Sequence, residues 1–185
     1  MKTSAELIDI ILGYNKHANI DLIQTAYLFA MESHAMQKRA SGAPYFQHPV
    51  EVAAYLAEQL HMDVPTIITG LLHDVLEDTN VCFEELEEIF DSEIAFLVEG
   101  VTKLSKISYT SSHKNLQAEN FRRFMVALSQ DIRVLVVKLV DRLHNMKTLN
   151  YISSLHKRRR IALETLEIYA PLAERIGMNI IKDEI

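Results

Sequence analysis

The stretch Gly70-Leu-Leu-His-Asp-Val-Leu-Glu-Asp-Thr79 ends an apolar segment with four ionisable side chains. Glu77 lies four residues after His73, so the two share one helical face. Asp78 is related to Asp74 in the same way, on the neighbouring face. Burying carboxylates is costly unless they are paired, hydrogen-bonded or bound to a metal. The stretch therefore predicts a helix that ends at a functional site; the alternative is that Glu77 and Asp78 form an ordinary solvated helix end.

Helical periodicity extends outward from this stretch through most of the chain. Apolar residues recur every three to four positions, as they do between Leu22 and Ala30. Helices are predicted over residues 4–12, 21–37, 49–60, 65–76, 83–90, 92–106, 116–129, 131–148 and 155–176. We therefore expect an all-α fold, a single helical bundle of about nine helices over residues 1–185.

Two segments fit this scheme less well. Residues 133–140 contain four valines, which favour a buried strand. The run continues without a break into Asp141, and a lone strand would have no partner, so a helix is the better prediction. Residues 107–115 are rich in Ser and Thr, which predicts a surface loop that could act as a mobile cover.

Composition and charge exclude several classes of protein. The net charge of −6 argues against nonspecific binding to nucleic acid or to acidic membranes. The basic run Lys157–Arg160 is interpreted as a solvated helix face. Five glycines in 185 residues do not suit a glycine-rich nucleotide fingerprint, and a lone Cys82 cannot form an internal disulfide. No apolar run reaches the length of a membrane span, and no targeting leader is evident, so we expect a cytoplasmic protein.

Two further clusters of polar residues carry candidate chemistry. Asp141, Asn145 and Thr148 form one helical stripe after the valine-rich run, and Asp141 must face either a basic side chain in a salt bridge or a metal ion. Residues 38–49 form a basic, turn-rich loop that leads into a helix beside His48. Loops of this kind often bind ligands, although this one could also be a simple connection in which His48 caps the helix.

Together these segments resemble the HD family of metal-dependent phosphohydrolases, and most closely the hydrolase domain of RelA/SpoT alarmone enzymes. The resemblance extends from about residue 26 to 176 and rests on an ordered set of motifs. They are SGAPYFQHPVEVA, HDVLEDT, FLVEGVTKL, QAENFRRF, DIRVLVVKLVDRLHNMKTL and ETLEIYAPLAERIGM.

The resemblance implies a divalent ion, usually Mn²⁺, held between the helices. The implied metal ligands are His48, His73, Asp74 and Asp141. Two imidazoles and two carboxylates would form a mixed nitrogen and oxygen shell with room for water. The resemblance also assigns Glu77 and Asp78 to catalysis, as carboxylates that position and activate the attacking water.

The implied reaction is hydrolysis of the alarmone (p)ppGpp, which loses its 3′-diphosphate as pyrophosphate and leaves GDP or GTP. By the same resemblance, Arg39 stacks on the base with Ser41 beside it, and Asn145 and Thr148 contact the nucleoside. Basic residues in the matching segments offset the net negative charge around this anionic substrate. They are Lys38, Arg39, Lys103, Lys106, Lys138, Arg142 and Lys147, of which Lys138 and Lys147 are expected to bind substrate.

Departures from the family pattern leave the substrate open. Ala40 and Ala43 stand where the family usually has Lys and Glu, and Lys147 stands where Arg is common. One alternative is therefore a phosphohydrolase of another nucleotide, of the ppApp or NADPH type. A second alternative is a module that binds a nucleotide without cleaving it. Without synthetase or regulatory domains, the 185 residues look like a stand-alone small alarmone hydrolase, or else a piece of a longer protein.

Overall fold

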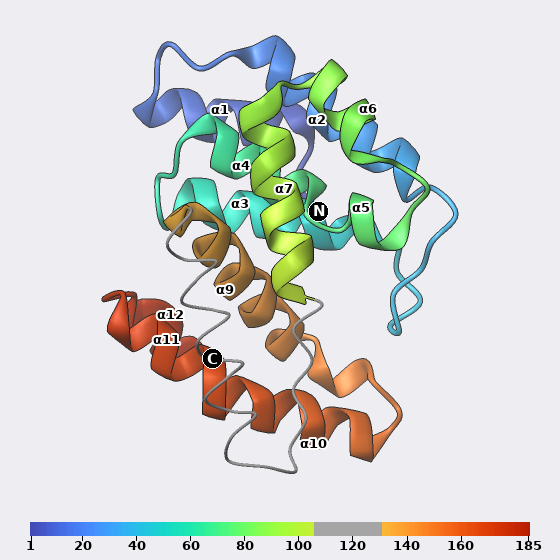
Figure 1. Ribbon diagram of the computed structural model, residues 1–185, viewed down its shortest axis with the longest axis vertical. Coiled ribbons are helices and arrows are strands. Elements are labelled where there is room, and N and C mark those ends of the chain that lie inside the picture. Colours follow the sequence, from blue (N-terminus) through green and yellow to red (C-terminus); the bar gives the residue numbers. More distant parts are fainter. Residues whose placement is uncertain (106–130) are drawn as a thin grey trace.

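The computed structural model describes residues 1–105 and 131–185, and within these ranges the fold is all-helical (Figure 1). An isolated bridge between Lys38 and Pro44 is the sole extended pairing in these ranges. The helices are α1 (Ser4–Tyr14), α2 (Ile20–Ser33), α3 (Gln47–Glu58), α4 (Val64–Leu72), α5 (Val75–Asp78), α6 (Phe83–Ile89), α7 (Ser92–Ser105), α9 (Ile132–Lys147), α10 (Leu155–Glu164), α11 (Ala170–Arg175) and α12 (Asn179–Glu184), with a 3-10 turn η1 (Leu149–Tyr151) and a π-helical segment η2 (Thr165–Tyr169). The all-α prediction is confirmed.

Helices α3, α4, α7 and α9 form the centre of the molecule and pack against one another. Gly70 allows a close approach of α4 to α3, because a Cβ there would lie 2.6 Å from the Leu56 side chain. Gly100 does the same for α7 and α9, where a Cβ would lie 2.8 Å from Val134. Helices α1 and α2 lie at one end of the molecule and α10 at the other (Figure 1). This packing fixes the places at which α3, α4 and α9 meet.

Polar caps begin several helices, as the sequence pattern requires. The side chains of Asn19, Asp63 and Asp131 each accept a backbone N–H in the first turn of their helices. At the start of α9, Arg133 forms ion pairs with Asp131, with Asp63 of the α4 cap and with Glu93 of α7. This group, the Arg133 network, joins the N-terminal ends of three central helices.

The predicted helix 65–76 is interrupted where the chemistry is concentrated. Helix α4 ends at Leu72, and α5 begins at Val75. His73 Nδ1 lies 2.9 Å from the Gly70 carbonyl oxygen. That oxygen is the acceptor that a continuous helix would offer to the backbone N–H of Asp74. The imidazole therefore takes over a helical hydrogen bond and sets His73 and Asp74 at the break.

Other boundaries also differ from the prediction. Helix α2 ends at Ser33, before the predicted residue 37, because the chain turns there so that Tyr45 N–H can donate to the Gln37 carbonyl at 3.0 Å. The predicted helix 155–176 contains the π-helical η2, and the short α12 was not predicted. Residues 133–140 lie within α9, so the helical interpretation is confirmed and the strand alternative is wrong. The predicted loop 107–115 and helix 116–129 lie outside the described residues. Within the described ranges, none of the helices has the length and apolar character that a bilayer crossing needs.

Candidate active site

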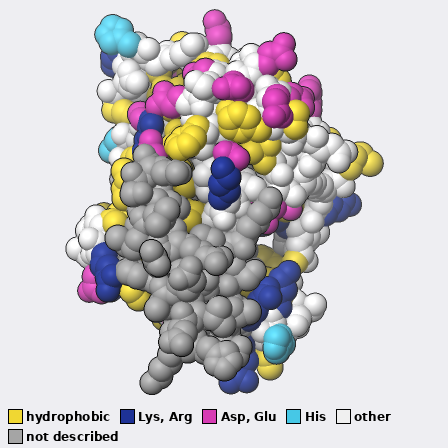
Figure 2. All heavy atoms as spheres, in the orientation of Figure 1, with side chains coloured by type: hydrophobic (Ala, Val, Ile, Leu, Met, Phe, Trp, Pro, Cys, Tyr) yellow, Lys and Arg dark blue, Asp and Glu magenta, His cyan; other side chains and the backbone are white. Residues whose placement is uncertain are grey.

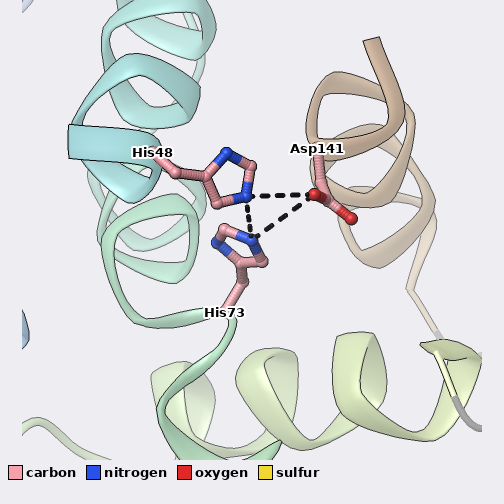
Figure 3. A group of neighbouring side chains, drawn as sticks. All are labelled: His48, His73 and Asp141. Carbon is pink, nitrogen blue, oxygen red and sulfur yellow. Dashed lines mark hydrogen bonds and ion pairs between the residues drawn. The ribbon is translucent and has the colours of Figure 1, made fainter. Parts of the chain in front are cut away.

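The four predicted metal ligands come together where α3, α4 and α9 meet, and Figure 3 shows three of them, His48, His73 and Asp141. His48 lies in the first turn of α3, His73 caps the end of α4, and Asp141 lies in the second half of α9. Asp74 occupies the break between α4 and α5. The first three residues are buried, and the Asp74 side chain is 14% exposed. His48 does not cap its helix, since Phe46 precedes the first turn and no side chain makes the cap bond.

Ring nitrogens and carboxylate oxygens converge in this cluster. His48 Nε2 lies 3.1 Å from Asp141 Oδ1 and 3.2 Å from His73 Nε2. Asp74 Oδ2 lies 3.2 Å from His73 Nε2 and 3.7 Å from His48 Nε2. One ligand atom from each of His48, His73 and Asp141 lies within 4.8 Å of the other two. This is the donor chemistry of a divalent-cation site.

Hydrogen bonds outside the cluster fix the two imidazole rings. With its Nδ1–H donated to the Gly70 carbonyl, His73 can direct the Nε2 lone pair into the cluster. His48 Nδ1 lies 2.8 Å from Nδ1 of His144, so the His48 Nε2 likewise faces the cluster. Metal-binding histidines usually donate their second nitrogen in this way. The residues therefore fit a divalent metal ion.

The electrostatic environment favours cation binding. Burial opposes a charge on His73, but the carboxylates of Asp74 and Asp141 outweigh it and raise the pKa of His73 to about 10. Burial lowers the pKa of His48. Burial also works against ionised Asp141, yet the Lys138 ammonium holds the pKa of Asp141 well below its ordinary range. Two carboxylates thus stay ionised around a position that a proton on His73 or a metal ion can occupy.

Asp141 uses its two oxygens differently. Its Oδ2 accepts from Lys138 Nζ at 2.7 Å, and its Oδ1 accepts from Asn145 Nδ2 at 2.6 Å while facing the imidazoles. Lys138 also donates to Ser105 Oγ at 2.8 Å. The salt bridge expected as one option for Asp141 is therefore present at Oδ2, while Oδ1 faces the imidazoles, as the metal-site option requires. This network holds the oxygen that faces the metal position.

Tyr45 connects the cluster to the acidic residues beside it. Its hydroxyl lies 2.7 Å from Asp74 Oδ2 and 2.8 Å from Asp78 Oδ2. Burial, together with the Asp74 carboxylate, raises the pKa of Tyr45 well above its ordinary value, so the phenol remains a hydrogen-bond donor. Glu77 and Asp78 are exposed, and both line a small cavity of about 230 Å³ together with Tyr45 and Asp74.

A larger cavity, of about 800 Å³, adjoins the other side of the cluster. His48, Lys138 and Asp141 line both cavities, so the metal position lies between them. The predicted substrate-binding residues all line the larger cavity: Arg39, Ser41, Lys138, Asn145, Lys147 and Thr148. Lys147 is also paired with Glu184, at 2.6 Å.

The positive charge around the larger cavity differs in part from the expectation. Lys103 pairs with Glu99 on the surface, Lys38 does not line the cavity, and Lys106 lies outside the described residues. Lys157 and Arg160 of the basic run are exposed, as the solvated-face interpretation expects, and they also line the cavity. In Figure 2, acidic side chains gather at the end that bears α6, and basic side chains lie beside α10 at the opposite end. Local charge therefore departs from the net charge of the chain.

Two residues that contact the cluster of predicted metal ligands, Tyr45 and His144, were not predicted from the sequence. Tyr45 lies in a motif already singled out, three residues before His48, but its contact with Asp78 spans 33 residues of sequence. His144 lies one turn after Asp141 on α9. Its spacing of three residues from a predicted ligand is the signal that could have identified it.

Comparisons with known proteins identify the family of the chain. The family model described as "HD domain" matches residues 26–179. The chain is 49% identical over all of its 185 residues to the GTP pyrophosphokinase rsh of Brucella ovis, covering 24% of that protein. It is 52% identical over 174 residues, or 93% of its length, to a GTP pyrophosphokinase of Myxococcus xanthus, covering 23% of that protein. It is 48% identical over 179 residues, or 97% of its length, to the bifunctional (p)ppGpp synthase/hydrolase SpoT of Escherichia coli K12, covering 25% of it.

The chain thus spans about a quarter of the length of these curated relatives. A solved structure, described as a metazoan ortholog of SpoT that hydrolyses ppGpp and plays a role in starvation responses, shares the fold. It superposes with a TM-score of 0.63 at 24% identity, covering 78% of this chain and 82% of the other. Because the family model spans most of the chain, the chain belongs to the HD-domain family, with homology to the hydrolase domain of RelA/SpoT proteins.

Proposed function

We propose that this chain hydrolyses (p)ppGpp, removing the 3′-diphosphate to give GDP or GTP and pyrophosphate, with Mn²⁺ as the metal ion. The observation that carries the proposal is the convergence of His48, His73, Asp74 and Asp141 between two cavities. The chain is also 48% identical to a relative named guanosine-3′,5′-bis(diphosphate) 3′-pyrophosphohydrolase. We propose further that residues 1–185 act as one hydrolase domain, since the apolar core includes Leu7 of α1 and Ile181 of α12.

The larger cavity suits a nucleotide. Its lining includes six basic residues, Arg39, Lys138, Arg142, Lys147, Lys157 and Arg160. Three of these charges are offset by neighbours, because Lys138 pairs with Asp141, Arg142 with Glu164 and Lys147 with Glu184. Arg39 is a planar cation at the cavity wall and can stack on a base. A volume of about 800 Å³ lies within the range of small-molecule sites.

The smaller cavity suits the attacking water and the leaving diphosphate. His48, His73, Asp74 and Asp141 would hold a divalent ion here, and it would supply Lewis-acid chemistry, polarising a phosphoryl oxygen and lowering the pKa of water. Glu77 and Asp78 face the cavity and supply carboxylates that accept the proton of the water. The water oxygen bonds to the phosphorus attached to O3′, the P–O3′ bond breaks, and O3′ takes up a proton. Tyr45 holds Asp74 and Asp78 in place through its hydroxyl.

Chromatography of the products tests this proposal. Purified chain is incubated with ppGpp, with Mn²⁺ in one sample and excess chelator in another. Release of GDP and pyrophosphate only in the presence of Mn²⁺ is the expected result. A protein that binds Mn²⁺ but leaves ppGpp intact would contradict the proposed substrate, and a protein that binds no divalent ion would contradict the metal site.

A related substrate is the second candidate. Ala40 and Ala43 line the larger cavity, at positions where the resemblance leads us to expect Lys and Glu. Both substitutions remove a charged side chain from the wall that faces the nucleotide. Relative turnover of ppGpp, ppApp and NADPH under the same conditions distinguishes the candidates. Restoring the expected residues as Ala40→Lys and Ala43→Glu should shift the preference toward ppGpp if these positions set it.

A further inference from the structure

His144 lies between the larger cavity and the cluster of predicted metal ligands, and the proposed chemistry does not use it. Its Nδ1 lies 2.8 Å from His48 Nδ1, and the two rings are tilted by 52° with centroids 4.6 Å apart. The same Nδ1 lies 3.5 Å from Nη2 of Arg39. His144 also lines the larger cavity. One nitrogen atom therefore faces a predicted metal ligand on one side and a cavity cation on the other.

The positions of the donors determine which state of His144 fits. The Nε2 of His48 faces Asp141 and His73, so a ligating His48 must carry its proton on Nδ1. That N–H points at His144 Nδ1, which must then accept. Arg39 has only donors, so it requires an acceptor at the same atom. Both neighbours select a neutral His144 with its proton on Nε2.

A second contact leads from Arg39 to the cluster. Arg39 Nη2 donates to Asn145 Oδ1 at 3.1 Å, and Asn145 Nδ2 donates to Asp141 Oδ1 at 2.6 Å. Arg39 thus touches His144 and Asn145, and each of these touches a different predicted ligand. Arg39 belongs to the loop of residues 38–44, whose turn contains Gly42 with a φ of +86° and is closed by Arg39 N–H donating to the Ala43 carbonyl at 2.9 Å.

We propose that His144 is a positioning residue that holds His48 in its metal-binding orientation, and that Arg39, through His144 and Asn145, couples the larger cavity to the metal cluster. Arg39 competes with His48 for the His144 lone pair and places a positive charge near the cation. A ligand that draws Arg39 into the cavity therefore strengthens metal binding, and metal binding strengthens that ligand's binding in return. The inference rests on the proposed function only in taking the cluster as a metal site.

Titration of the metal-free chain with Mn²⁺, followed by the electron paramagnetic resonance signal of free Mn²⁺, tests the positioning role. His144→Phe keeps a ring but removes the acceptor, and we expect Mn²⁺ binding to weaken by about 10- to 100-fold. His144→Asn can present an amide oxygen near the position of Nδ1 and should recover most of the affinity. His17→Phe, at an exposed histidine of the α1–α2 connection, is the matched control. Unchanged affinity in His144→Phe, or equal losses in the Phe and Asn variants, would overturn the role.

Nitrogen NMR of the histidine rings gives a second readout on the unsubstituted chain, so the test does not depend on whether a variant folds. With Zn²⁺ as a diamagnetic probe, we expect the proton of His48 on Nδ1 and that of His144 on Nε2. A proton on Nδ1 of His144 would overturn the inference whatever the variants do.

The coupling is tested at Arg39. Arg39→Met should tighten Mn²⁺ binding by at least about five-fold, and its effect should shrink in the His144→Phe background because the two share one contact. Lys38→Met removes a neighbouring cation of the same loop that does not line the cavity, and it should leave the affinity unchanged. Equal effects of the two substitutions on Mn²⁺ affinity would mean that Arg39→Met acts only by removing a positive charge. That result would overturn the coupling. None of these measurements uses a nucleotide, so they stand or fail separately from ppGpp hydrolysis.

Discussion

Two clusters of charge lie about two turns apart on α9, and they are built in opposite ways. In the Arg133 network, one guanidinium donates to Asp131, Glu93 and Asp63 at 2.7, 2.7 and 3.0 Å, at the surface. In the cluster at Asp141, two imidazole Nε2 atoms face each other at 3.2 Å, and two carboxylate oxygens face them, with almost no exposure to water.

The difference separates a stabilising arrangement from a binding one. Each of the three guanidinium nitrogens of Arg133 donates to a carboxylate, so the network is satisfied by groups of the protein itself. The cluster at Asp141 brings atoms that can all act as electron-pair donors to one position, where they are complementary only to a shared proton or cation. Burial makes that requirement stronger, because a carboxylate removed from bulk solvent is costly unless an opposite charge or a hydrogen bond compensates it.

The largest expected effect follows from removing a ligand. Asp141→Asn removes a negative charge from the cluster and should weaken Mn²⁺ binding by more than about 100-fold, since loss of an outer-shell partner alone costs 10- to 100-fold. Hydrolysis of ppGpp should be lost with the metal. Calorimetric titration and product chromatography measure the two. If Arg133→Met produced the same metal loss, the contrast between the two clusters would not hold.

Substitution of Glu77 should separate the rate of hydrolysis from the affinity for the metal ion. Glu77→Ala should leave Mn²⁺ binding intact and slow hydrolysis by about 10²- to 10⁴-fold, the usual share of general-base catalysis. The exposed Glu84 of α6 provides a control, as Glu84→Ala should change neither quantity. A fully active Glu77→Ala would remove Glu77 from the mechanism and leave its helix end as a solvated one.

Substitution of Lys138 tests how far the stability of the protein depends on neutralising the buried Asp141 carboxylate. Lys138→Met leaves the buried Asp141 carboxylate without its ammonium partner, and it should destabilise the metal-free protein by about 3–5 kcal/mol. Saturating Mn²⁺ should recover part of the loss, because it supplies positive charge at the same carboxylate and binds the native state. Urea unfolding with chelator and with Mn²⁺ measures both. A loss that Mn²⁺ does not change would place Lys138 outside the electrostatics of the site.

A smaller effect is expected from Arg133. Arg133→Met removes ion pairs at the surface, where each contributes little, and should lower the free energy of unfolding by roughly 1 kcal/mol. Metal affinity should stay unchanged. The same urea experiment serves as the measurement, and a loss as large as that of Lys138→Met would show that the two clusters are energetically alike.

The smallest effect is on the pH dependence of stability. The hydrogen bond from Arg133 lowers the pKa of Asp131 below its ordinary value of 3.8. A depressed carboxylate pKa contributes stability that is present above the unfolded pKa and is lost as the pH falls through the folded one. The stability difference between the unsubstituted chain and Arg133→Met should therefore narrow below about pH 4. Urea midpoints between neutral and acidic pH measure it, and a constant difference would mean that Asp131 is not the partner that matters.

The sequence was sufficient for the all-helical fold class and for most of the described helices, because periodicity and i+4 spacing are local properties. It could not predict the break at His73 and Asp74, where no Gly or Pro marks an end. That break depends on an imidazole that competes for the Gly70 carbonyl, and on α3 and α9 bringing His48 and Asp141 to meet it. For a related reason, the sequence could not predict that Lys157 and Arg160 lie beside the larger cavity. Their place on the cavity wall depends on how α10 returns past α9, which no local pattern encodes.

The loop of residues 38–44 has its anchors at its two ends. Gln37 Nε2 donates to the Asp78 carbonyl at 2.6 Å, and the Tyr45 hydroxyl bonds to Asp74 and Asp78. Ala40 and Ala43 lie between these anchors, and both line the larger cavity. Side chains at the tip can therefore be exchanged while the loop stays attached to the catalytic corner. Under the proposed function, substitutions at these two positions would alter the wall that faces the nucleotide and would leave the residues of the cluster at Asp141 in place.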